Sequence, residues 1–110
     1  MSVVTHFYVS PDMTNEFQDG VKKVNAAIDA ARYPAKPGRW YQLVNGGEVP
    51  HYVLVSDRAS WEEMTPPAQT MDEALGPDGA AALAQVRKAS RKISTEIIVY
   101  RPDLSFIPGK

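Results

Sequence analysis

The feature that most constrains the fold is a change of hydrophobic period that occurs twice along the chain. Residues 3–9 (VVTHFYV) are β-branched or aromatic, which is typical of a strand. In residues 14–32 the apolar side chains lie three and four residues apart, as on one face of a helix. The first part of the chain therefore predicts a strand and then a long amphipathic helix, which Thr14 or Asp12 can cap.

Two further strands are predicted in the middle of the chain. Residues 39–44 (RWYQLV) and 51–56 (HYVLVS) have strand composition. Asn45-Gly46-Gly47 lies between them, and both residue types accept positive φ angles. The segment therefore predicts a hairpin, with a loop longer than the minimal two residues.

The last third of the chain returns to the helical period and ends in a strand. Residues 60–63 and 70–73 form capping boxes, which predict one short helical turn and one short helix. A longer helix is expected to follow, with Asp78 as its cap and its end near Ile93. Residues 95–101 (TEIIVYR) predict the last strand.

This order of elements, βαββαβ, specifies an α+β fold. It is the order of the ferredoxin-like fold, in which a four-stranded antiparallel sheet has two helical regions on one face. A chain of 110 residues is long enough to bury one core and has the size of one domain. We therefore expect residues 1–110 to form a single ferredoxin-like domain.

The strands are apolar on both faces, although two helices cover only one face. In the first strand Phe7 and Val9 point one way, while Val4 and Tyr8 point the other way. The third and fourth strands share this property, so the pattern does not decide which face meets the helices. A large uncovered apolar face usually marks an interface, and we expect a two-fold homodimer in which the sheets pack face to face.

Three segments, together with the order of elements, resemble a known group of proteins. They are LVNGGEVPHYVLV (residues 43–55), SWEEM (60–64) and YRPDLSF (100–106). With them the chain resembles the dimeric α+β barrel superfamily, and in particular its small bacterial members of unknown function. The resemblance implies a homodimer with a barrel-like pair of sheets. It implies no single activity, because members include cofactor-free monooxygenases, haem-degrading enzymes and lactone isomerases.

Composition argues against several classes of partner. The net charge of −1 gives no long-range attraction for nucleic acid. The absence of cysteine excludes disulfides and thiolate metal sites. No apolar run approaches the roughly 20 residues that a membrane span needs, and the first residues lack the pattern of a signal peptide. The expected location is therefore the cytoplasm, with no membrane partner.

The two histidines are the candidates for proton transfer. His6 lies in the middle of the first strand among aromatic residues, and it is the candidate catalytic base because an imidazole titrates near neutral pH. The alternative is a histidine that is hydrogen-bonded inside a core or an interface. His51 begins the third strand and is expected beside His6 if these strands are neighbours. Their spacing matches no known metal-ligand pattern, so no metal is expected.

Aromatic residues are the candidates for a binding pocket. Aromatic walls with a few polar tips describe a small-molecule site, and they also describe the centre of a dimer interface. The pocket is expected between the sheet and the second helical region, with the candidate residues Tyr8, Trp40, His51, Trp61 and Tyr100. In the resemblance, Trp61 matches a tryptophan of the haem-degrading members, which also use a histidine on the following helix. No histidine occurs from residue 62 onward, so neither haem nor another cofactor is expected.

Two functions from different classes follow from these features. The leading interpretation is a homodimer that binds a small apolar or aromatic metabolite, with a cofactor-independent reaction of the monooxygenase or isomerase kind as its activity. The alternative is a non-enzymatic interaction module that docks through residues 65–68 or through the tail, where Arg101 and Asp103 can form an ion pair. The sequence does not decide whether the protein is an enzyme.

Overall fold

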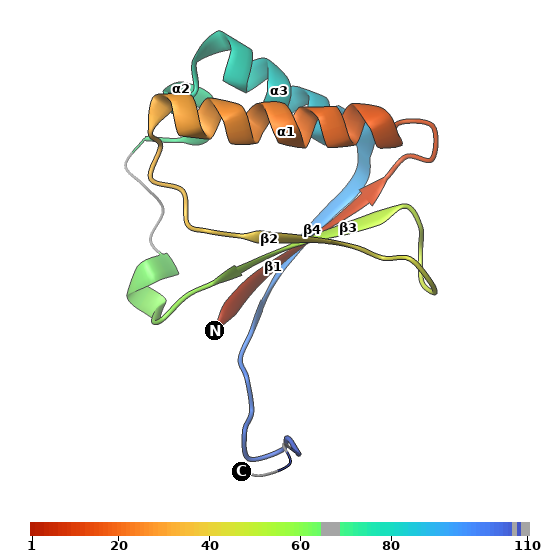
Figure 1. The fold of residues 1–110 in the computed structure, drawn as a ribbon, viewed down its shortest axis with the longest axis vertical. Helices are drawn as coiled ribbons and strands as arrows, with labels where there is room; N and C mark the ends of the chain where they lie inside the picture. The colour runs from red at the N-terminus through yellow and green to blue at the C-terminus, as the bar shows by residue number, and fades with distance from the viewer. Residues whose placement is uncertain (65–68, 107, 109–110) are drawn as a thin grey trace.

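The computed structural model describes residues 1–64, 69–106 and 108. Its sheet has the strand order β2-β3-β1-β4, and every neighbouring pair is antiparallel. Figure 1 shows α1 and α3 together on one side of this sheet. The predicted ferredoxin-like α+β fold is thus confirmed. The elements are β1 (Ser2–Val9), α1 (Thr14–Ala31), β2 (Arg39–Gln42), β3 (His51–Asp57), the 3₁₀ helix η1 (Trp61–Met64), α2 (Met71–Ala74), α3 (Gly76–Ala89) and β4 (Ser90–Ile98).

The boundary between the last helix and the last strand differs from the prediction. The helix ends at Ala89 and not near Ile93, and β4 begins immediately afterwards. Ile93 lies opposite Phe7 in the β1–β4 ladder. The strand also ends at Ile98, whereas residues 95–101 were expected to form it. Pairing with β1 outweighs the helical spacing of the apolar residues in this segment.

The predicted caps of the two long helices are wrong. Met13 occupies the N-cap of α1, and neither Thr14 nor Asp12 caps the helix through its side chain. Leu75 occupies the N-cap of α3, so Asp78 lies inside the first turn. There its carboxylate complements the positive end of the helix dipole without capping an amide.

The two capping boxes do form short helices. Thr70 Oγ1 accepts a hydrogen bond from the backbone N–H of Glu73 at 3.3 Å, as expected at the start of α2. In η1 the Glu63 carboxylate accepts from the backbone N–H of Ala59, one residue before the expected donor. The hairpin glycines Gly46 and Gly47 have φ angles of 79° and 62°, which confirms the predicted turn.

One end of the helix layer packs tightly on the sheet. Phe17 and Val9 are fully buried, and Phe17 stacks on Tyr52 with ring centroids 4.9 Å apart. The two helices also touch each other closely. A Cβ atom on Gly20 of α1 would lie 2.9 Å from Cγ2 of Val86 in α3, so only glycine permits this approach. Both helices are therefore fixed at this end.

The structure settles which face of the sheet meets the helices. Phe7, Val9 and Tyr52 belong to the side that packs under α1 and α3. Because side chains alternate along a strand, their neighbours point to the other side, which no described helix covers. We call this side the open face. Its main residues are Val4, His6, Tyr8, Tyr41, His51, Val53, Val55, Glu96 and Ile98.

Candidate functional site

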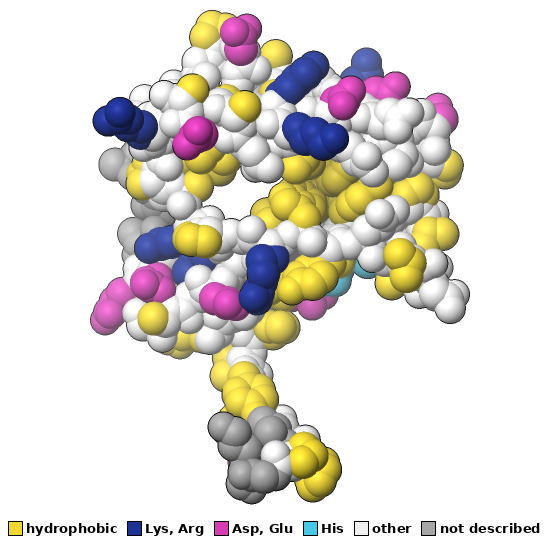
Figure 2. Space-filling view, viewed as in Figure 1, with side chains coloured by type: hydrophobic (Ala, Val, Ile, Leu, Met, Phe, Trp, Pro, Cys, Tyr) yellow, Lys and Arg dark blue, Asp and Glu magenta, His cyan; other side chains and the backbone are white. Residues whose placement is uncertain are grey.

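A cleft of about 1010 Å³ lies between the helices and the sheet. Figure 1 shows why it forms, since the helices approach the sheet at one end and diverge from it toward the other. Figure 2 shows the resulting hollow, with hydrophobic side chains on its wall. The sheet contributes Val3, Thr5, Phe7, Trp40, Leu54, Ser56 and Ile93 to this cleft, and the helices contribute Val21, Val24, Ile28, Leu83 and Val86.

Two aromatic rings form the inner wall of the cleft. The rings of Phe7 and Trp40 lie with their centroids 5.2 Å apart, and Trp40 also meets the edge of Phe17 at 5.8 Å. These contacts fix the indole against the buried core, because three rings in mutual contact restrict one another. The wall is therefore a rigid aromatic surface that an apolar ligand can cover.

The rim of the cleft carries charged side chains. Arg87 pairs with Asp72 at 3.3 Å, and the Glu63 carboxylate is engaged by the backbone of Ala59. Arg58 also lies on the rim, and its donors are only partly used. The cleft thus combines an apolar interior with polar groups at its edge, which is the usual composition of a small-molecule site.

The open face carries a separate cluster around the two histidines. His6 Nδ1 and His51 Nε2 lie 3.0 Å apart, as the neighbouring strands predicted. The His51 ring stacks on Tyr8 with centroids 4.3 Å apart, and His6 Nε2 lies 3.7 Å from a Glu96 oxygen. The distance allows one ring to donate a hydrogen bond to the other.

His51 is buried and held near other charges. Burial and the nearby His6 lower its pKa below the ordinary value of 6.5. Arg91 lowers it further and Glu48 raises it. The neutral imidazole is therefore the form that the folded chain favours.

We expect the free energy of unfolding to fall as the pH decreases through about 6.5. Near this pH, His51 of the unfolded chain takes up a proton, whereas His51 of the folded chain does so only at a lower pH. Acid therefore favours the unfolded state. Urea unfolding between pH 7.5 and 5 measures this slope. His51→Gln should flatten it, and an unchanged slope in that variant would show that other groups produce it.

Sequence comparison finds no relative, since no family model and no curated protein matches the chain. Solved structures do match. A NIPSNAP domain protein from Burkholderia xenovorans has a TM-score of 0.63 at 13% identity, covering 96% of this chain and 100% of that one. A proposed antibiotic biosynthesis monooxygenase from Caulobacter crescentus CB15 has a TM-score of 0.59 at 18% identity, covering 90% and 89%. Another from Nitrosomonas europaea has a TM-score of 0.54 at 14% identity, covering 91% and 100%.

The chain shares its ferredoxin-like fold with these proteins. The matches confirm the fold that the order of elements predicted. At 18% identity or less they establish the fold and no activity.

Within this ferredoxin-like fold, the sequence-predicted site residues do not share one pocket. Trp40 lies on the wall of the cleft. His6, Tyr8 and His51 lie together on the open face, on the opposite side of the sheet. Tyr100 lies beyond β4 and is 59% exposed. The expected pocket is thus divided between the two faces of the sheet.

Trp61 lies outside the cleft as well. Its side chain is 64% exposed on η1, although Met64 of the same helix reaches the cleft wall. In the part of the chain that the structure describes, no three histidine or acidic side chains are placed to hold a metal ion.

Two cleft residues were not singled out by the sequence. Phe7 was noted only as part of a strand face, because both faces of that strand are apolar. Arg58 directly follows a strand in which Ser56 is two residues earlier on the cleft side. The position of this arginine just after a strand could have indicated a binding residue. It does so only once it is known which face of the sheet the helices cover.

Among the described residues, no helix has the length and hydropathy needed to cross a bilayer.

Proposed function

We propose that the protein binds a small apolar or aromatic metabolite in the cleft between the helices and the sheet. The observation that carries this proposal is a space of about 1010 Å³ whose inner wall is formed by Phe7 and Trp40. Clefts of this size with apolar walls and few polar groups are the usual form of small-molecule sites.

The reaction class that we propose is a cofactor-independent one, of the monooxygenase or isomerase kind. Two structural neighbours are named as proposed antibiotic biosynthesis monooxygenases, which supports this class. The support is by fold analogy, so the activity has to be tested on the protein itself.

We also propose that the protein is a homodimer through the open face. Tyr41 is 51% exposed there and Ile98 is 49% exposed, beside the partly buried Val53 and Val55. Exposed apolar side chains gathered on one sheet face are typical of an interface. A second copy related by a two-fold axis would cover them with the same set of residues.

The open-face cluster supports a second candidate site. His6, our proposed catalytic base, contacts His51 at 3.0 Å and lies 3.7 Å from Glu96, so its ring is oriented for proton transfer. A ligand that uses this base would lie between the two sheets of the dimer and not in the cleft.

A non-enzymatic module remains the alternative, and the tail supports it. Leu104 is 74% exposed and Phe106 is 89% exposed on a segment that projects away from the sheet (Figure 1). The predicted pair of Arg101 and Asp103 forms within this tail. The other proposed docking segment, residues 65–68, lies outside the described residues.

Native mass spectrometry of protein purified from cells without added ligand tests the main proposal. We expect a mass of two chains with retained small-molecule mass, which would also identify the ligand by weight. A dimer without retained mass in every preparation would favour the interaction module.

Two variants locate the binding site with a neutral aromatic probe, 2-naphthamide. We expect Trp40→Ala to weaken its binding about tenfold, because an indole face is lost from the wall of the cleft. His6→Ala should leave binding unchanged, since His6 lies on the opposite face of the sheet. Isothermal titration calorimetry measures both. The reverse result would move the binding site to the open face.

A further inference from the structure

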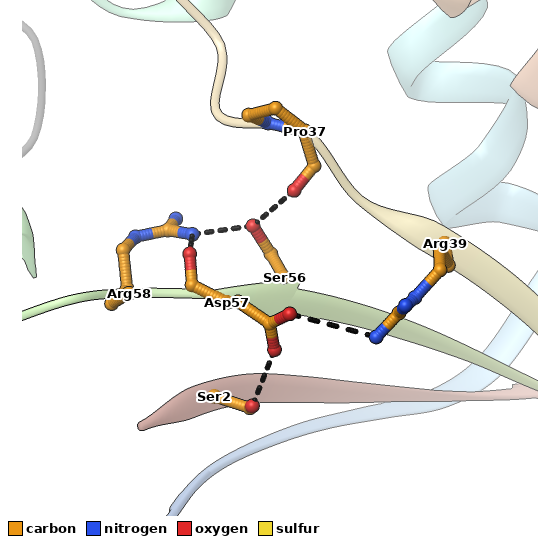
Figure 3. Close-up of polar contacts among 6 residues, drawn as sticks. All are labelled: Ser2, Pro37, Arg39, Ser56, Asp57 and Arg58. Carbon is orange, nitrogen blue, oxygen red and sulfur yellow. Dashed lines mark hydrogen bonds and ion pairs between the residues drawn. The ribbon is translucent and has the colours of Figure 1, made fainter.

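Arg58 is held at the rim of the cleft by a defined set of contacts. Its Nη1 donates to Ser56 Oγ and, at 3.0 Å, to the backbone oxygen of Asp57. Ser56 is itself buried, and its hydroxyl donates to the backbone oxygen of Pro37 at 2.7 Å. Figure 3 shows this chain of contacts, in which the guanidinium lies beside the hydroxyl of Ser56. Both hydrogens of Nη1 are therefore used, and the orientation of the guanidinium is fixed.

The opposite edge of the same guanidinium has no partner. Its Nε is buried and meets no acceptor within residues 1–64, 69–106 and 108, and no acceptor for Nη2 is found there either. A buried donor without an acceptor costs free energy, so each such group calls for an explanation.

Four of the other five arginines of the chain find carboxylates. Arg39, Arg87 and Arg91 pair with acidic side chains at 3.3 to 3.5 Å, and Arg101 pairs with Asp103 at 2.7 Å. Arg58 has no acidic partner among the described residues. The remaining residues, 65–68, 107 and 109–110, include no aspartate or glutamate in the sequence.

The free edge of Arg58 has the shape that a carboxylate requires. In the tail, Nε and Nη2 of Arg101 donate to the two oxygens of Asp103 at 2.9 and 2.7 Å. In Arg58 the same two atoms have no acceptor among the described residues, and because Nε is buried a carboxylate would reach it by displacing the side chains that cover it. A planar carboxylate can accept both hydrogen bonds at once, which makes this pairing stronger and more specific than a single contact.

The geometry points to a ligand with a carboxylate group, and we propose that Nε and Nη2 of Arg58 bind it. The aromatic body of the ligand then lies against Trp40. This inference rests on the proposal that the cleft is the binding site. The guanidinium contacts Ser56, which is two residues along β3 from Leu54, the partner of Trp40. Two residues of strand span about 7 Å. An aryl carboxylic acid has the length that this separation needs.

A matched pair of probes tests the proposal on the full chain. The acid 2-naphthoate and the amide 2-naphthamide have the same ring system and differ in charge. We expect calorimetry to show that the wild-type protein binds the acid about tenfold more tightly or better. Arg58→Gln should bring the acid to the affinity of the amide and leave the amide unchanged. Arg39→Gln is the control, because it removes the same charge from an arginine that pairs with Asp57 and does not line the cleft.

Each outcome separates the two proposals. Equal binding of the two probes by the wild type, or a preference for the acid that persists in Arg58→Gln, would overturn the carboxylate inference and leave the cleft as the binding site. A lack of saturable binding for both probes would overturn both the carboxylate inference and the cleft proposal.

If Arg58→Gln does not fold, the Nε–H resonance of Arg58 in the wild-type protein tests the carboxylate inference. It should shift with 2-naphthoate and not with 2-naphthamide, and the absence of that shift would overturn the inference.

Discussion

Replacing Phe17 by alanine is expected to lower the free energy of unfolding by about 3–5 kcal/mol. Phe17 is 1% exposed and contacts the rings of Phe7, Trp40 and Tyr52. Truncation removes the buried ring and leaves a cavity between α1 and the sheet, which the fixed helices cannot close. Since small domains are stable by about 5–15 kcal/mol in total, the loss would be a large fraction of the stability.

Urea unfolding at one fixed protein concentration measures this effect, because dimerisation would otherwise change the apparent stability. Phe106→Ala is the matched control, since that ring is 89% exposed and should change stability by no more than about 0.5 kcal/mol. A loss below about 1 kcal/mol in Phe17→Ala would contradict the burial of the ring in the core.

In the proposed homodimer, replacing Val53 by aspartate is expected to separate the two copies into monomers. Val53 lies between Tyr41 and His6 in one row across the open face. In a face-to-face dimer both copies would carry the new carboxylate in an apolar interface, where an unpaired charge costs several kcal/mol. The side chain points away from the core, so the domain itself should remain folded.

Light scattering coupled to size exclusion measures the mass of the particle in solution. Val44→Asp is the control because Val44 is 88% exposed and follows β2, off the sheet face, so it should leave the dimer intact. A dimeric Val53→Asp variant would place the interface elsewhere on the molecule. A monomeric wild type would refute the homodimer proposal itself.

The order and kind of the main elements could be predicted from hydrophobic period and turn residues alone. The error at residues 90–93 has a clear physical reason. Ile93 continues the helical spacing of Val86 and Ala89, and it also begins a period-two series with Thr95 and Ile97. Both patterns fit the local sequence, and only the pairing of β4 with β1 selects the strand.

The location of the site was much less predictable. Along β1, Phe7 and Tyr8 have similar local environments in the sequence, yet the helices cover only the first of them. Which of the two side chains is covered depends on how α1 and α3 pack on the sheet, and the sequence of β1 alone does not determine that packing. The sequence therefore identified Trp40 as a wall residue and placed His6 and His51 side by side, but it joined two faces of the sheet into one pocket.

Strand β3 contributes to both of these surfaces. Leu54 and Ser56 lie on the cleft, and Val53 and Val55, which alternate with them along the strand, lie on the open face. The proposed ligand site and the proposed dimer contact thus share one backbone segment, and any coupling between the two binding events is reciprocal by thermodynamic linkage. A ligand that binds the dimer more tightly than the monomer must strengthen the association of the two copies by the same factor.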